Sequence, residues 1–170
     1  MNPTSAIALV VLVLLAVAGV VIGHIGLPSQ PATVLPAPKH TLELAPPPVC
    51  EPERAPCEAR HKAKRIALRF LEPAQALEPF AVEVALASAK PDGTPAVLPI
   101  AGVVIELDMV RMDMGYHRHR LDRVAEGVYR GELLLPVCQS GRLDWYAQIE
   151  AQVGNERWQT RFDFEIDPPA

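Results

Sequence analysis

One short stretch of this 170-residue chain gathers side chains that bind soft metal ions. Three methionines and two histidines lie within eleven residues: Met109, Met112, Met114, His117 and His119. Thioether sulfur suits Cu(I), and imidazole binds copper in either oxidation state. Cys138 could add a sulfur ligand if the end of its strand lies alongside. The candidate copper ligands are therefore Met112, Met114, His117, His119 and Cys138.

The same residues also have a purely structural interpretation. Methionine fills irregular gaps in protein cores, and a free cysteine such as Cys138 is often a small buried apolar residue. His117 and His119 could point outward among the neighbouring arginines Arg118, Arg120 and Arg123. Sets of Met and His have no spacing rule as tight as the Cys and His patterns of zinc sites, so both interpretations stay open.

The strand pattern leading into this stretch shifts by one residue. Apolar side chains occupy odd-numbered positions from Val103 to Met109 and even-numbered positions from Val110 to Met114. One extra residue in a strand produces such a shift and re-aims the side chains that follow. The pattern predicts a β-bulge near Met109–Val110.

Two of the three cysteines lie close together in the sequence. Cys50 and Cys57 bracket the segment EPERAP, whose two prolines exclude a helix. A disulfide between them is favoured, and closing so short a loop would stabilise the fold by about 2–3 kcal/mol. Three cysteines allow three single pairings, so Cys138 as a partner of either one stays open.

Residues after Lys62 alternate between apolar and polar with a period of two, which predicts half-buried strands. The clearest alternation covers residues 143–153 and 157–166, with turn residues Val153–Glu156 between them. This pattern predicts a β-hairpin that places Trp145 and Trp158 in the core.

Further turn signals separate the other apolar runs, at Pro91-Asp92-Gly93, Glu126-Gly127 and Ser140-Gly141. About seven short strands result over residues 62–170, and no helix-period stretch supplies the crossovers of a parallel sheet. We therefore expect an all-β domain, an immunoglobulin-like antiparallel β-sandwich, preceded by one transmembrane helix.

The N-terminal region predicts that helix. After a short tail (residues 1–5), residues 6–27 carry no Asp, Glu, Lys or Arg and approach the ~20 residues that span a bilayer. A cleavable signal peptide is the alternative, with Ala16–Ala18 as its cleavage site. Apolar residues continue past that site and the tail lacks Lys and Arg, so an anchor is favoured.

Residues 28–61 are proline-rich and predict an extended, semi-rigid linker containing Cys50 and Cys57. The tail has nothing to fold, and a disulfide suits an oxidising space. We expect a single-pass membrane protein with its C-terminal domain extracytoplasmic, on the periplasmic side of a bacterial inner membrane.

Composition and motifs argue against two classes of function, nucleic-acid binding and catalysis. The formal charge of −4 argues against nonspecific nucleic-acid binding, although the run Arg60–Arg65 is basic. A contact of that run with anionic lipid requires the domain to fold back toward the membrane. No nucleophile elbow, Walker loop, HExxH or GxGxxG appears, and nothing indicates a cleft around Glu106, Asp108 and Asp113, so no enzyme is expected.

The segments DMVRMDMG and GVYRGELLLPVCQSGRLDW, together with the anchor, resemble the membrane-anchored FixH and YtkA-like proteins of bacteria. The resemblance covers Ile66 to Ile166 and departs from the family at Cys50, Cys57 and Cys138. It implies copper delivery or assembly of haem-copper oxidases. The expected function is thus a non-enzymatic accessory protein for copper or for a membrane redox complex. The alternative is a metal-free interaction module that binds another envelope protein.

Overall fold

The computed structural model describes residues 37–113, 115, 117–136 and 143–166, which contain nine strands and no helix. The strands are β1 (His40–Glu43), β2 (Cys57–His61), β3 (Lys64–Phe70), β4 (Pro79–Ala87), β5 (Ile100–Met109), β6 (Arg118–Ala125), β7 (Val128–Leu134), β8 (Asp144–Val153) and β9 (Glu156–Glu165). The all-β prediction is confirmed for these residues. Seven of the strands, β3 to β9, lie in the described part of residues 62–170, where about seven were expected, and β1 and β2 precede that range.

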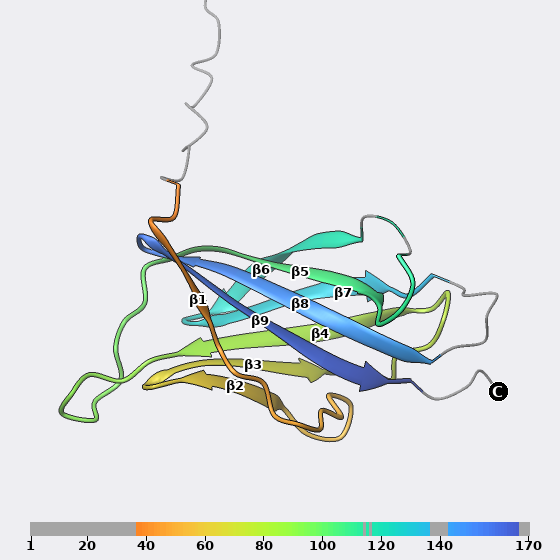
Figure 1. Cartoon of the computed structure of the whole chain (residues 1–170), viewed down its shortest axis with the longest axis horizontal. Helices are drawn as coiled ribbons and strands as arrows, with labels where there is room; N and C mark the ends of the chain where they lie inside the picture. Colours follow the sequence, from red (N-terminus) through yellow and green to blue (C-terminus); the bar gives the residue numbers. More distant parts are fainter. Residues whose placement is uncertain (1–36, 114, 116, 137–142, 167–170) are drawn as a thin grey trace, which may run out of the picture. The chain divides into compact units, whose positions relative to one another are not determined.

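The strands form one sheet in the order β1-β9-β8-β5-β6-β7-β4-β3-β2 (Figure 1). All neighbours are antiparallel except β1 and β9, which run parallel with His40 opposite Glu156. The outermost strands also approach each other, because Ala45, just after β1, forms an antiparallel bridge with Arg60 of β2. The sheet is therefore nearly closed on itself.

The core lies on the inner face of this curved sheet. Alternate residues of β3, β4, β8 and β9 are buried, as the period of two predicts. Phe70 of β3 packs against Phe80 of β4 and against Phe164 of β9, with ring centroids 5.1 Å apart in both pairs. Since β3 and β9 are far apart in the strand order, the contact between Phe70 and Phe164 joins opposite parts of the sheet through the core.

The predicted C-terminal hairpin is confirmed. Strands β8 and β9 pair in continuous register from Asp144↔Glu165 to Val153↔Glu156. The turn between them uses Gly154, whose φ of 56° lies in the left-handed region that glycine enters without steric cost. Trp145 and Trp158 are each only 1% exposed, so the hairpin carries both indoles into the core as predicted.

Ordered pairing begins earlier in the chain than the expected domain boundary at Lys62. Strands β1 and β2 both lie within residues 28–61, the range expected to form a linker. The Cys50 and Cys57 sulfurs are 2.10 Å apart and form the favoured disulfide, which leaves Cys138 out of that pairing. Both cysteines are buried, so the end of the supposed linker is part of the core.

The predicted tail (residues 1–5) and membrane anchor (residues 6–27) lie outside the described residues. Among the described residues, no helix has the length and apolar character needed to cross a membrane.

Candidate functional site

Pairing of β5 with β6 determines where the two candidate histidines lie. His119 is opposite Ile105 in the ladder, and the Leu107 amide donates a hydrogen bond of 3.1 Å to the His117 carbonyl oxygen. Directly opposed residues in an antiparallel ladder place their side chains on the same face. Because Ile105 and Leu107 are fully buried, both imidazoles are at inner-face positions, and both are half-buried.

The interpretation in which both histidines point outward with the arginines is wrong. Arg118 and Arg120 alternate with the histidines along β6 and are exposed, opposite Glu106 and Val104. Arg118 forms a 2.6 Å ion pair with Glu150 on the outer face. The two imidazoles therefore share the other face, with their Cα atoms about 6.6 Å apart along the strand.

Met112 lies just beyond the end of β5. Its backbone bridges to Met109, with Val110 and Arg111 forming the turn between them. Met109 is a core residue at 2% exposure, whereas Met112 is 41% exposed. A thioether is thus presented at the end of the strand whose partner carries the histidines.

The predicted bulge near Met109–Val110 is wrong. Pairing of β5 with β8 is continuous from Gly102 to Met109, and the irregularity in that ladder falls between Ile100 and Gly102. The parity shift in the sequence arises because the strand ends at Met109 and the chain turns. A tight turn and a bulge leave the same trace in a hydrophobic pattern, since each changes the alternation by one residue.

Three of the five candidate ligands are placed by these contacts, namely Met112, His117 and His119. Met114 and Cys138 lie outside the described residues. Within the described part of the chain, no group of three or more His, Cys, Asp or Glu side chains could hold a metal ion. Among the described residues, thioether sulfur is therefore the donor that could accompany the two imidazoles.

Two glycines of the GVYRG segment have structural roles beside this site. Gly127 has φ +70°, and a Cβ there would lie 2.5 Å from the Leu86 carbonyl oxygen. A Cβ at Gly131 would lie 2.6 Å from Leu121 Cδ2, so this glycine makes room for the inward side chain next to His119. Tyr129 between them is buried. The spacing of this segment thus follows from the packing of the β6–β7 hairpin.

A pocket of about 450 Å³ lies next to the β5–β6 turn. Its lining combines the disulfide loop with the ends of β8 and β9, and Val110 connects it to the turn that leads to Met112. Five carboxylates line it: Glu51, Glu53, Asp144, Asp163 and Glu165. Arg54 pairs with Glu51 at 2.6 Å, and the Ala74 amide donates to Glu53 at 2.8 Å. The excess of carboxylates favours cations over anions.

The sequence does not predict that Asp108, a carboxylate on the outer face of the sheet, is buried. Asp108 is 8% exposed and accepts a 2.8 Å hydrogen bond from the Met109 amide. The Tyr146 hydroxyl donates to Asp108 at 3.4 Å, and the Arg161 guanidinium lies 3.8 Å from the Tyr146 ring centroid. Burial, and then the Asp108 charge, raise the pKa of Tyr146. The only sequence signal was an acidic residue inside an apolar run.

Comparisons with protein-family models, with curated proteins and with solved structures find no match for this chain. The resemblance to the FixH and YtkA-like proteins stays a prediction.

Proposed function

We propose that this chain is a membrane-anchored extracytoplasmic accessory protein that holds Cu(I) for a membrane redox complex and performs no catalysis. The proposed ligands are Met112, His117 and His119, which lie near the end of the β5–β6 ladder, together with Met114 and Cys138. Two imidazoles and one or more thioethers suit copper better than hard cations, which prefer oxygen ligands.

The inward placement of His117 and His119 is the observation that carries this proposal. Histidines on the solvent-facing side of β6 would share the face of Arg118 and Arg120. These two histidines instead occupy the same face as Leu107 and Met109. The acidic pocket next to Val110 supports the proposal, because carboxylates near a cation site raise the local cation concentration.

The proposed fold type is an immunoglobulin-like sandwich. One layer consists of β9, β8 and β5, and the other of β3, β4 and β7, with β6 pairing partly to each. The parallel pairing of β1 with the last strand and the crossing from β4 to β5 between layers support this type.

Location outside the cytoplasm is proposed from the anchor and the disulfide together. The apolar segment at residues 6–27 is long enough to hold the chain in a bilayer. The disulfide between Cys50 and Cys57 suits an oxidising compartment such as the bacterial periplasm.

A Cu(I) titration of the full chain in detergent micelles tests the proposal, under reducing conditions that spare the disulfide and with a chromogenic chelator as competitor. One Cu(I) per chain is expected, with at least a tenfold loss of affinity in the Met112→Leu/Met114→Leu variant. Met109→Leu is the matched control, since it removes a thioether that is buried in the core. Binding that is absent, or equal in all three proteins, would contradict the copper site.

A metal-free interaction module is the second candidate, and one feature of the sheet favours it. Pairing between β6 and β7 stops at Asp122↔Arg130, so residues Gly131–Leu134 of β7 pair with β4 alone. An extended peptide can add to such an edge by backbone hydrogen bonds. If the chain is such a module, it should capture a partner from membrane extracts even in the presence of a Cu(I) chelator. The Leu134→Pro variant should fail to capture that partner.

A further inference from the structure

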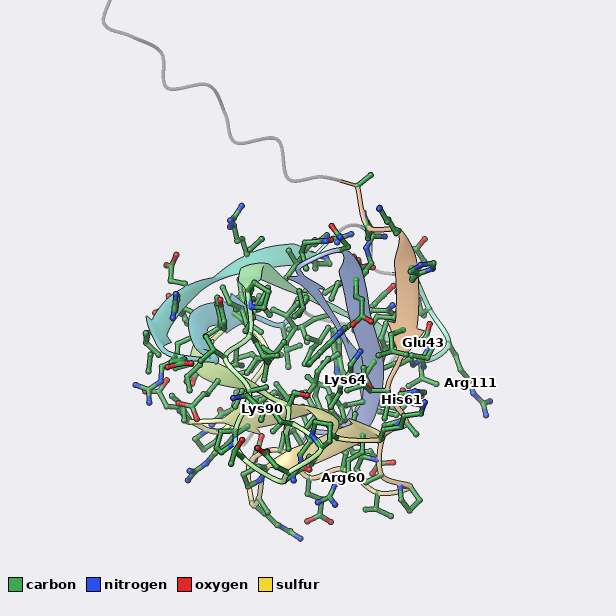
Figure 2. The ribbon with its side chains drawn as sticks, turned by 90° about the vertical axis from the view of Figure 1, so that its left-hand side faces the viewer. Glu43, Arg60, His61, Lys64, Lys90 and Arg111 are labelled. Atoms are coloured by element: carbon green, nitrogen blue, oxygen red, sulfur yellow. A yellow bond between two sulfur atoms is a disulfide. The ribbon has the colours of Figure 1, made fainter. Side chains whose placement is uncertain are left out.

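Five segments meet at one end of the domain, which we call the basic end. They are residues 39–40, 61–65, 88–99, 125–128 and 153–156. Several contacts link them: the Lys39 amide donates to Asn155 at 2.8 Å, the Gly154 amide donates to Pro99 at 2.9 Å, and Lys64 Nζ lies 2.6 Å from the Glu156 carboxylate. Leu86, two residues before the segment 88–99, donates its amide to Gly127 at 2.7 Å. Figure 2 views this end, with His61, Lys64 and Lys90 labelled on it.

The basic end has an excess of positive charge although the chain as a whole is acidic. Its five segments contain five Lys or Arg side chains (Lys39, Lys62, Lys64, Arg65 and Lys90) and three acidic ones (Asp92, Glu126 and Glu156). Three of these charged side chains are engaged within the domain. Lys64 Nζ lies 2.6 Å and Trp158 Nε1 2.8 Å from the Glu156 carboxylate, and Arg65 Nε lies 3.6 Å from the Glu58 carboxylate. Lys39, Lys62 and Lys90 are exposed, and the histidines His40 and His61 lie among them.

The opposite end of the domain is acidic. Strands β3, β5 and β9 all lead away from the basic end, so the residues that follow them gather at the far end. Acidic side chains outnumber basic ones there: Glu51, Glu53, Glu72, Glu78, Asp113, Asp144, Asp163 and Glu165 against Arg54, Arg69, Arg111, Arg118 and Arg161. The charge of the domain is thus polarised along its strands.

The chain enters the domain at the basic end, because Lys39 is hydrogen-bonded to the β8–β9 turn. Only eleven residues, 28–38, separate the proposed anchor from Lys39, and a fully extended segment of that length reaches at most about 40 Å. This step rests on the proposed membrane anchor. Val97 lies on the same end and is 80% exposed, as suits a side chain at the headgroup boundary.

We propose that the basic end docks on anionic phospholipid headgroups of the membrane that holds the anchor. Each lysine near an anionic surface strengthens binding about fivefold, and the acidic end is repelled by the same surface. Docking would orient the domain with its carboxylate-lined pocket and Met112 pointing away from the bilayer, toward a membrane complex with an extracytoplasmic part.

Amide hydrogen exchange of the full chain in lipid nanodiscs tests this proposal. Exchange in residues 61–65 and 88–97 is compared between discs of phosphatidylcholine and discs containing phosphatidylglycerol. We expect slower exchange in the anionic discs at 0.15 M salt and loss of the difference at 0.5 M salt, because charge interactions at the surface are screened. Lys62→Glu/Lys90→Glu should abolish the difference, whereas the matched change Arg54→Glu/Arg111→Glu at the acidic end should preserve it.

Each other result overturns the lipid assignment. Equal exchange in the two discs, from a chain that co-purifies with the disc, contradicts docking and leaves the anchor intact. A chain that does not co-purify with the disc contradicts the anchor and the docking together. Slower exchange in phosphatidylcholine discs after addition of inorganic phosphate would show that the basic end binds a free anion. Slower exchange only after addition of heparin would show that it binds an acidic macromolecule.

Discussion

Ala45 and Arg60 exchange two backbone hydrogen bonds, with N–O distances of 3.0 and 2.9 Å, that join the two outermost strands of the sheet. The segment 40–45 therefore contacts β9 through strand β1 and β2 through Ala45. The Cys50–Cys57 disulfide lies in the connection between the two edge strands. Closure of the sheet thus depends on a segment of few residues and one covalent crosslink.

Removing the disulfide should weaken this closure. The Cys50→Ala/Cys57→Ala variant is expected to lose about 2–3 kcal/mol of unfolding free energy, because the crosslink restricts a short loop in the unfolded chain. Denaturant unfolding measures the loss, and amide exchange at Ala45 and Arg60 should accelerate more than exchange in β8. Cys138→Ala is the control for thiol content. Equal stability with and without the crosslink would contradict a role in closure.

Two glycines with positive φ should respond differently to alanine. Gly127→Ala combines backbone strain with a Cβ placed 2.5 Å from the Leu86 carbonyl oxygen, whereas Gly93→Ala has φ +83° and no atom within 4 Å. We expect a loss of about 1–2 kcal/mol at Gly93 from strain alone and a larger loss at Gly127. Thermal unfolding of both variants measures the difference, and equal losses would mean that the contact with Leu86 relaxes freely.

Glu156 should make the domain sensitive to acid. Its pKa is lowered by the hydrogen bond from Lys64 and then by that from Trp158. A carboxyl with a lowered pKa stabilises the fold at pH values above its ordinary value and loses that contribution as the pH falls through the lowered value. Glu156→Gln should therefore be less stable than the unmodified protein at pH 7. Its unfolding free energy should also fall less on acidification below about pH 4.5.

Unfolding free energies at pH 7 and pH 3 measure the effect of Glu156→Gln. The loss at pH 7 should be modest, roughly 0.2–1 kcal/mol, because the Glu156 side chain is 39% exposed and the ion pair is screened by water. Glu126→Gln, in an exposed turn, is the matched control. Parallel pH profiles for the protein and for Glu156→Gln would contradict the assignment.

Substitutions on the two faces of β6 should distinguish copper ligation from a general effect of charge. His117→Ala and His119→Ala are each expected to reduce Cu(I) affinity at least tenfold, because each removes one imidazole from the inner face. Arg118→Ala and Arg120→Ala change the alternate positions of the same strand and should leave affinity within about twofold. Chelator competition measures all four variants. An equal loss for histidine and arginine variants would show that electrostatics, not ligation, governs binding.

Much of the fold follows from local pattern. The alternation in residues 143–166 specifies which side chains of β8 and β9 are buried, and both tryptophans lie where that alternation places them. Strand β1 has only four residues among prolines, and it pairs with a strand more than a hundred residues away. Local sequence propensity does not indicate a partner strand that distant, so the proline-rich segment predicts a linker.

The candidate site was less accessible to sequence reasoning. The face of the sheet on which His117 and His119 lie depends on the register of β6 against β5. Hydrophobic alternation does not determine this register, because β6 has a single buried residue, Leu121. The turn at Val110 and Arg111 cannot be distinguished from a bulge in the sequence, because both shift the alternation by one residue. The burial of Asp108 comes from the neighbouring strand that carries Tyr146, so the sequence around Asp108 does not indicate it.

The parallel pairing of β1 with β9 also orders events during synthesis. His40 can meet Glu156 only after 116 further residues have been made, so the earliest described strand must wait for the last one. Contacts of such high sequence separation are slow to form. The disulfide, by contrast, closes over a separation of seven residues and can form while most of the domain is still unmade. A nascent chain stopped before β9 would expose the unpaired edge of β8, which makes truncated products prone to aggregation.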